Sequence, residues 1–243
     1  MIKEITSTSN ELIKKLAKLK DTKNIKKEGM FLIEGEHLIK EAKDDLLFIL
    51  TLHELEEFNC DQYIVTKDIL TKLSNGKSFS RVIGVTRLLK SRAIETNKVV
   101  YLNKVQDPGN VGTIFRTSLA FSYFDVVVDS GCAYQYSSKV IQSSQGSIFK
   151  LNINNGNINT LKQLKKDGYK IICTCLDPNS KKLSEICKVF DKICVVFGNE
   201  GQGIDQEILD LSDIKLIIEM SNIDSLNVAI SAGIILYELN KLD

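Results

Sequence analysis

Residues 98–129, KVVYLNKVQDPGNVGTIFRTSLAFSYFDVVVD, hold two short apolar runs with a helix-like stretch between them. The runs Lys98–Val105 and Phe124–Asp129 are rich in valine and predict strands, and the apolar spacing over Asn110–Phe121 predicts a helix. Two strands joined through a helix lie parallel in one sheet, with helices covering its faces. The stretch therefore predicts an α/β fold built on a parallel sheet.

The same alternation continues toward the end of the chain. We expect helices at Ser137–Ser144, Asn159–Asp167 and Leu226–Leu239, and strands at Phe149–Ile153, Tyr169–Leu176, Ile193–Gly198 and Lys215–Glu219. Ligands of parallel sheets bind beyond the carboxyl ends of the strands. The loops that follow Val105, Phe197 and Met220 are therefore predicted to form a functional site.

The first ninety residues show shorter alternations, which predict a small α/β domain of their own. Strands are expected at Met30–Ile33, Leu46–Thr51, Tyr63–Thr66 and Val82–Thr86, and helices near Gly35–Lys43, near Lys67–Asn75 and from Glu11, with Ser9 or Asn10 as the N-cap. The polar segment Arg87–Asn97 is predicted to be a linker. We therefore expect an N-terminal domain over residues 1–94 and a C-terminal domain over residues 95–243.

Overall charge is close to balanced, with 32 Lys and Arg against 31 Asp and Glu in 243 residues, which excludes a histone-like polycation. Residues 3–27 nevertheless contain eight lysines and three acidic residues. These lysines fit either the solvated face of a surface helix or a surface that contacts nucleic-acid phosphates. No apolar run approaches the roughly 20 residues that cross a bilayer, and no signal-peptide core is evident, so we expect a cytoplasmic protein that makes no membrane contact.

Cysteine and histidine are too few and too scattered to suggest a metal site. The six cysteines form no C-x-x-C pair, and we expect them to be reduced, buried thiols. The two histidines, His37 and His53, lie outside the loops named above. The expected chemistry therefore uses neither a metal nor a histidine.

The first loop runs from Asp107 into the predicted helix with the sequence DPGNVGT. Asn110 is expected to cap this helix, and Gly112 permits the close approach of a ligand or another backbone. Arg116, farther along the helix, is either a solvated surface arginine or a clamp for an anion at the sheet edge.

The second loop, GNEGQGI over residues 198–204, has three glycines that can present bare peptide groups to a ligand. Their order is G-x-x-G-x-G and not the dinucleotide fingerprint G-x-G-x-x-G, which disfavours a nucleotide-binding oxidoreductase. Glu200 is either an exposed turn residue or a fixed acceptor for a hydroxyl, an amine or an arginine.

The third loop, SNIDSLN over residues 221–227, leads into an almost wholly apolar helix. Asp224 or Ser225 is the expected N-cap, and Asn227 is a poor residue for a helix start unless its amide has a partner. A helix without a polar stripe is either wrapped within its domain or shared with another subunit.

Together, NVGTIFR at residues 110–116, VVFGNEGQGI at 195–204 and SLNVAISAGIILYE at 225–238 resemble the three ordered motifs of SpoU (TrmH-type) RNA methyltransferases of the SPOUT class. The N-terminal stretch is similar to the substrate-binding domain of the ribosomal-RNA members, a fold akin to RNA-binding ribosomal proteins. The resemblance implies a deep trefoil knot and methyl transfer from S-adenosylmethionine to a ribose 2′-hydroxyl. It also implies structured RNA, most readily rRNA, as partner, and a homodimer formed through the C-terminal domain.

The resemblance further implies roles for particular residues. Arg116 corresponds to the catalytic arginine and Asn110 to its companion in the motif. The residues expected to organise the active site are Glu200, Ser225 and Asn227, and those expected to hold the cofactor, largely through backbone, are Gly198, Ile218 and Leu226. A guanidinium is a poor base, so we expect Arg116 to hold an RNA phosphate and to stabilise the developing alkoxide, with a general-base role left open.

Two positions depart from the family pattern. Glu219 stands where the family usually has proline, and Ser221 where glycine commonly follows the methionine. Both lie beside the expected cofactor loop. They leave open a non-catalytic RNA-binding or assembly factor that has kept the fold, and the motifs leave open tRNA as the substrate.

Overall fold

The computed structural model describes residues 1–75, 80–177, 179–186 and 190–241. The chain forms two compact units, one of Met1–Lys90 with Tyr134–Phe149 and one of Ser91–Ala133 with Lys150–Asp243. The first unit therefore includes a segment that the sequence-based division assigned to the C-terminal domain. An aromatic contact contributes to this grouping, because the rings of Phe31 and Tyr136 lie 4.8 Å apart.

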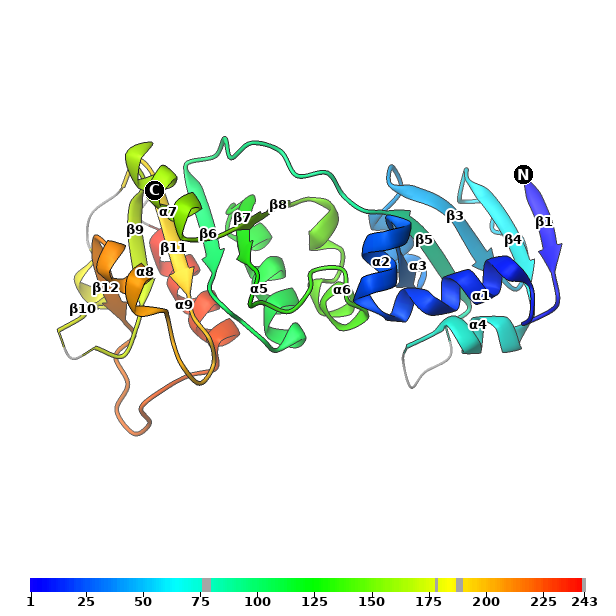
Figure 1. The fold of residues 1–243 in the computed structure, drawn as a ribbon. Coiled ribbons are helices and arrows are strands. Elements are labelled where there is room, and N and C mark those ends of the chain that lie inside the picture. Colours follow the sequence, from blue (N-terminus) through cyan, green and yellow to red (C-terminus); the bar gives the residue numbers. More distant parts are fainter. Residues whose placement is uncertain (76–79, 178, 187–189, 242–243) are drawn as a thin grey trace. The chain divides into compact units, whose positions relative to one another are not determined.

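The first unit is built on a five-stranded mixed sheet with the strand order β1-β4-β3-β5-β2 (Figure 1). Its strands are β1 Ile2–Ile5, β2 Met30–Glu34, β3 Leu46–Thr51, β4 Asp61–Val65 and β5 Val82–Arg87. Its α-helices are α1 Glu11–Ala17, α2 Thr22–Glu28, α3 Glu36–Glu41, α4 Lys67–Leu73 and α6 Ser138–Ser144, with one-turn 3₁₀ helices at Lys18–Lys20 and Ser147–Phe149.

The predicted elements of this unit are confirmed, and two further elements were missed. The side chain of Asn10 accepts from the Leu12 N–H at 2.9 Å and caps α1, as predicted. The missed elements are strand β1 and helix α2. Strand β1 is four residues long and mostly exposed, and α2 buries only Ile25, so neither has an apolar period that a sequence pattern could reveal.

The second unit is built on a seven-stranded sheet, all parallel, with the order β10-β12-β9-β11-β6-β7-β8. Its strands are β6 Lys98–Leu102, β7 Asp125–Asp129, β8 Asn152–Gly156, β9 Lys170–Thr174, β10 Lys181–Lys182, β11 Ile193–Phe197 and β12 Ile214–Ile217. Its helices are α5 Pro108–Ala120, α7 Ile158–Lys166, α8 Gln206–Leu211 and α9 Val228–Asn240, with a 3₁₀ turn at Leu183–Glu185. The predicted α/β fold with a parallel sheet is confirmed.

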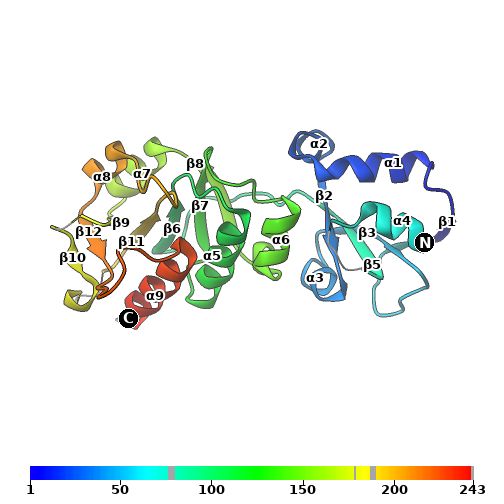
Figure 2. The ribbon, with the colours of Figure 1, turned by 90° about the horizontal axis from the view of Figure 1, so that it is seen from below.

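Helices cover both faces of this sheet, with α5 and α9 side by side on one face and α7 and α8 on the other (Figure 2). The buried core on the α7–α8 side joins Val99 and Val127 of the strands to Leu161 and Ile208 of the helices. Strand β6 ends at Leu102, three residues earlier than predicted, because the next residues turn out of the sheet. Helix α8 was not predicted.

Cysteine burial agrees only in part with the prediction. Cys173 and Cys194 are buried, whereas Cys60, Cys132 and Cys175 are half-buried, and all five carry free thiols. Cys187 lies outside the described residues. Within the described part of the chain, no helix has the length and apolarity of a membrane span, and no group of three or more Cys, His, Asp or Glu side chains is arranged to hold a metal ion.

Candidate functional site

Glu200 joins the loops that follow strands β11 and β6. Its carboxylate accepts hydrogen bonds from the backbone N–H groups of Gln106 and Asp107, at 3.2 and 3.1 Å, and from the side-chain amide of Asn110 at 2.9 Å. Burial alone would raise the pKa of Glu200, but these hydrogen bonds outweigh it and hold that pKa below its usual value. Glu200 is therefore a fixed acceptor, and the donors are amides of its own chain.

Asn110 bridges this junction to the third loop. The predicted cap of helix α5 was wrong by three residues, because Asp107 is the N-cap and its carboxylate accepts from the Asn110 backbone N–H at 3.0 Å. The Asn110 side chain thereby becomes available for tertiary contacts. Its amide nitrogen donates to Glu200, and its oxygen accepts from the amide of Asn227 at 3.0 Å.

Asn227 is itself the N-cap of helix α9, which corrects the expectation that Asp224 or Ser225 would cap it. The Asn227 oxygen accepts from the backbone N–H groups of Ala229 and Ile230, at 2.9 and 3.3 Å. The other end of the same amide donates to Asn110, which is the partner that a helix-start asparagine was expected to need. Glu200, Asn110 and Asn227 thus form one hydrogen-bonded chain across three loops.

A cavity of about 710 Å³ lies beside these hydrogen-bonded side chains, at the carboxyl edge of the sheet. The predicted site residues that line it are Gly198, Glu200, Ile218, Ser225, Leu226 and Asn227. Apolar side chains from β12 and α9, among them Leu216 and Ile235, complete its wall. These six residues bring the second and third loops together at one edge, and the first loop joins them through the hydrogen bonds of Asn110 to Glu200 and Asn227.

Gly198 is required by the closure of its own loop. A Cβ atom at this position would lie 2.5 Å from the carbonyl carbon of Gly203. Asn199 and Gly203 exchange backbone hydrogen bonds of 2.9 and 3.0 Å, and Gly203 has a φ of 71°. The loop therefore returns tightly on itself and exposes backbone to the cavity.

Arg116 lies apart from this junction. It is exposed on α5, six residues beyond Asn110, and it is not among the residues that line the cavity. Among the described residues it has no hydrogen-bond or ion-pair partner. A separation of six residues corresponds to about 9 Å along a helix and to a different face.

The departure at Glu219 leaves the cavity wall intact. The carboxylate of Glu219 is exposed and accepts from the hydroxyl and the backbone N–H of Ser184, which lowers the pKa of Glu219. Its neighbours Ile218 and Met220 line the cavity in its place. Ser221 is exposed and does not line the cavity.

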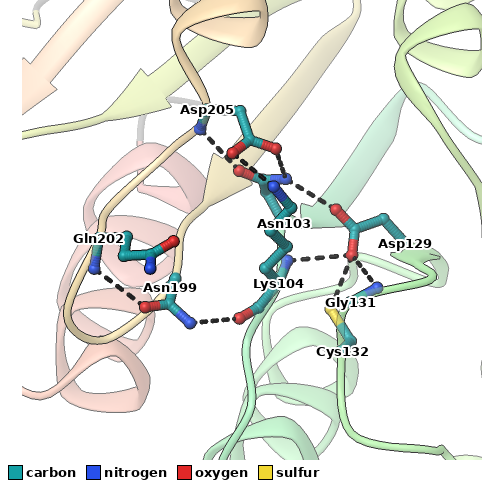
Figure 3. Close-up of polar contacts among 8 residues, drawn as sticks. All are labelled: Asn103, Lys104, Asp129, Gly131, Cys132, Asn199, Gln202 and Asp205. Atoms are coloured by element: carbon teal, nitrogen blue, oxygen red, sulfur yellow. Dashed lines mark hydrogen bonds and ion pairs between the residues drawn. The ribbon is translucent and has the colours of Figure 1, made fainter.

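A partly buried polar cluster beside the loops, centred on the buried side chain of Asn103, was not predicted (Figure 3). It brings together Asn103, Lys104, Asp129, Asn199 and Asp205. The only signal in the sequence was the polar pair Asn103-Lys104 directly after a buried strand.

Known proteins resemble this chain over nearly its whole length. The SpoU rRNA Methylase family matches residues 97–237, and the MRM3-like substrate binding domain matches residues 10–84. The chain is 31% identical to the 23S rRNA (guanosine(2553)-2′-O)-methyltransferase RlmP of Bacillus subtilis, over 98% of this chain and 99% of that protein.

Solved structures have the same fold over nearly the whole chain. A TrmH-family structure from Porphyromonas gingivalis is 26% identical, with a TM-score of 0.86 over 97% of this chain and 99% of that one. The AdoMet-bound rRNA methyltransferase of Sinorhizobium meliloti has the same fold, at 23% identity and a TM-score of 0.87, over 99% and 98% of the two chains. The chain therefore belongs to the SpoU rRNA methylase family, which confirms the family predicted from its three motifs.

Proposed function

We propose that this chain transfers a methyl group from S-adenosylmethionine to the 2′-hydroxyl of a ribose in ribosomal RNA. The observation that carries the proposal is the Glu200–Asn110–Asn227 chain beside the cavity, because it joins all three family motifs at one point. Ribosomal RNA is favoured over tRNA because the similarity to RlmP spans the N-terminal unit as well as the methyltransferase region.

The cavity fits the cofactor of this family. Its volume lies within the range of about 300–1,000 Å³ that is usual for small-molecule sites. It combines apolar side chains, suited to an adenine ring, with the exposed backbone of the glycine loop, suited to polar groups. Gly198, Ile218 and Leu226 would hold S-adenosylmethionine, which supplies a methyl group on a positively charged sulfur.

The residues of this chain would align the acceptor and stabilise its charge. Glu200, Asn110 and Asn227 would keep the three loops in register, and Ser225 would face the reacting region from the cavity wall. Arg116 would hold an RNA phosphate and stabilise the alkoxide that develops as the 2′-hydroxyl loses its proton.

We further propose that two chains pair through helix α9. Ile230 and Tyr237 are 55% and 49% exposed, and Gly233 between them has open space beside it. These residues recur at helical spacing and form an uncovered apolar stripe. Because α5 packs against α9, pairing would bring Arg116 of one chain toward the cavity of the other.

The trefoil knot belongs to the same proposal. The segment between β12 and α9 crosses from the outer part of the sheet to reach α5, and it contributes Met220, Ser225 and Leu226 to the cavity wall. This return beside the glycine loop supports the proposed knot.

The N-terminal unit offers a surface for RNA. Lys14, Lys15, Lys18 and Lys27 line a hollow of about 270 Å³ between α1 and α2. Lys15 is paired with Glu28 at 2.6 Å, so the lysine face is partly neutralised. Contacts of the remaining ammonium groups with phosphates would position RNA without reading its sequence. We retain residues 1–94 as the proposed substrate domain and residues 95–243 as the methyltransferase domain.

Two measurements test the proposal. Calorimetry with S-adenosylmethionine should show binding at one site per chain, and no detectable binding would favour a non-catalytic RNA-binding factor instead. Mapping of ribose methylation in total RNA from cells lacking this protein should show one lost 2′-O-methyl group in rRNA. A loss confined to tRNA would overturn the assignment of the substrate.

A further inference from the structure

We propose that Asn103 and Lys104, at the exit of strand β6, are positioning residues that fix the glycine loop carrying Glu200. The inference rests on the proposed function, because it concerns how the loop is held at the catalytic edge. Neither residue lines the cavity. Both residues act through the glycine loop, which does line the cavity.

Asn103 ties three segments together through one buried amide (Figure 3). It is 1% exposed. Its oxygen accepts from the Asp205 backbone N–H at 2.9 Å, and its nitrogen donates to the carboxylates of Asp129 at 2.7 Å and Asp205 at 3.1 Å. Asp205 is the residue at which the glycine loop passes into helix α8. The amide of Asn103 therefore fixes the far end of that loop against β6 and β7.

Lys104 holds the near end of the loop through its backbone. It has a φ of 55°, a left-handed conformation that non-glycine residues rarely adopt. Its N–H donates to Asp129 at 3.0 Å, and its carbonyl accepts from the Asn199 amide at 2.8 Å. Its ammonium group lies 2.7 Å from Asp205. The surrounding contacts thus impose a conformation that directs the Lys104 carbonyl toward the loop.

Asn199 transmits this position to Glu200. Its oxygen accepts from the N–H groups of Gly201 and Gln202, both at 2.9 Å, while its nitrogen binds Lys104. Glu200 lies between Asn199 and Gly201 in the sequence, and its carboxylate accepts from the backbone N–H of Gln106, two residues beyond Lys104. The exit of β6 therefore holds the glycine loop from both sides.

The charges of the cluster explain why an amide occupies position 103. Asp129 and Asp205 both accept from Asn103, and within the described part of the chain the ammonium group of Lys104 is the one that pairs with this cluster, through Asp205. The hydrogen bonds from Lys104 and Asn103 lower the pKa of Asp205, so this carboxylate stays ionised. An aspartate at position 103 would place a third negative charge there and remove the shared donor.

Two substitutions of Lys104 separate the role of its backbone from that of its charge. Lys104→Gly retains the left-handed conformation and loses the ion pair with Asp205, whereas Lys104→Val opposes the conformation as well. We expect Lys104→Val to lower kcat about tenfold or more with little change in KM for RNA, and Lys104→Gly to remain within about threefold of the wild type. Asn103→Leu should resemble Lys104→Val.

Ser122→Val is the matched control. Ser122 also has a left-handed φ, 63°, in the same unit, but it lies in the turn before β7, and among the described residues it makes no hydrogen bond with the glycine loop. It should lose stability as Lys104→Val does, and yet keep the wild-type kcat at temperatures where it is folded.

Hydrogen exchange gives a readout that does not depend on activity. In full-length protein, the amides of residues 198–205 should exchange about tenfold faster in Lys104→Val than in Ser122→Val. Wild-type kcat and exchange in both Lys104→Val and Asn103→Leu would overturn the positioning role. Wild-type protein that neither binds S-adenosylmethionine nor methylates RNA would overturn the proposed function, and the exchange comparison would still decide the positioning role.

Discussion

The side-chain amide of Asn227 donates to the side-chain oxygen of Asn110 across 3.0 Å, although the two residues are 117 positions apart in the chain. Each lies at the start of a helix, and α5 and α9 pack against each other. The bond therefore aligns two helix starts at the edge of one cavity. The two side chains have different further partners, because Asn227 also caps its own helix whereas Asn110 also donates to Glu200.

Asn227→Asp should separate capping from alignment. Aspartate caps a helix as well as asparagine does, but it cannot donate to Asn110, and it adds a negative charge near Glu200. We expect kcat to fall about tenfold or more while the free energy of unfolding changes little. Asn227→Ala, which loses the capping bonds as well as the bond to Asn110, should in addition cost about 1 kcal/mol of stability in urea titrations. Wild-type kcat in Asn227→Asp would contradict the alignment role.

Gly198→Ala should damage the cavity through the backbone. The new methyl group would lie 2.5 Å from a backbone atom of Gly203, so the loop must shift, at a cost of about 1–3 kcal/mol. Calorimetry should show weakened binding of S-adenosylmethionine.

Gly201→Ala is the control in the same loop, because its nearest neighbour would lie 3.7 Å away, in ordinary contact. We expect this variant to bind the cofactor as the wild type does. Equal losses in both variants would show that any added side chain disturbs the loop, and would contradict the specific clash.

Glu200 should make stability depend on pH on the acid side. Its folded-state pKa lies below the unfolded value of about 4.3, so its contribution is present above that value and is lost as the pH falls through the lower folded value. The difference in unfolding free energy between wild type and Glu200→Gln should be constant near pH 7 and shrink below about pH 4. A difference that grows on acidification would contradict the hydrogen-bond pattern.

Sequence patterns predicted which loops form the site, but not which residues cap the helices. Buried strands and glycine-rich turns follow from composition and spacing, and in a parallel sheet they bring Gly198 and Leu226 to one edge. Capping is a choice among adjacent polar residues that tertiary contacts decide, so Asp107 caps α5 while Asn110 bonds across loops.

The end of strand β6 was mispredicted for a similar reason. The apolar pattern runs on to Val105, and nothing in it reveals that Lys104 takes a left-handed conformation held by Asp129. The position of Arg116 likewise could not follow from its motif, because the helix turns it away from the cavity of its own chain.

Arg116→Lys should lower turnover about 100-fold or more while leaving cofactor affinity unchanged. Lysine keeps the charge but loses the planar group that holds two oxygens at once. Methyl transfer at the wild-type rate in this variant would remove Arg116 from the mechanism.

Pairing through α9 should be abolished by a charge in its apolar stripe. We expect Ile230→Glu to sediment as a monomer where the wild type sediments as a dimer, because Ile230 is 55% exposed within that stripe. Leu47→Glu, at an exposed apolar residue of the first unit, is the control and should leave the association state unchanged. Monomeric wild-type protein at micromolar concentration would contradict the proposed dimer.

Mixing two impaired chains should then reveal whose cavity Arg116 serves. A dimer of one Arg116→Lys chain and one Asn227→Asp chain has no complete site if each arginine acts within its own chain. If each arginine acts in the partner's cavity, the Arg116→Lys chain keeps Asn227 and receives an intact arginine, so one of the two sites is complete. Because Arg116 lies outside its own chain's cavity wall, we expect methyl transfer to recover on mixing, and no recovery from stable mixed dimers would assign Arg116 to its own chain.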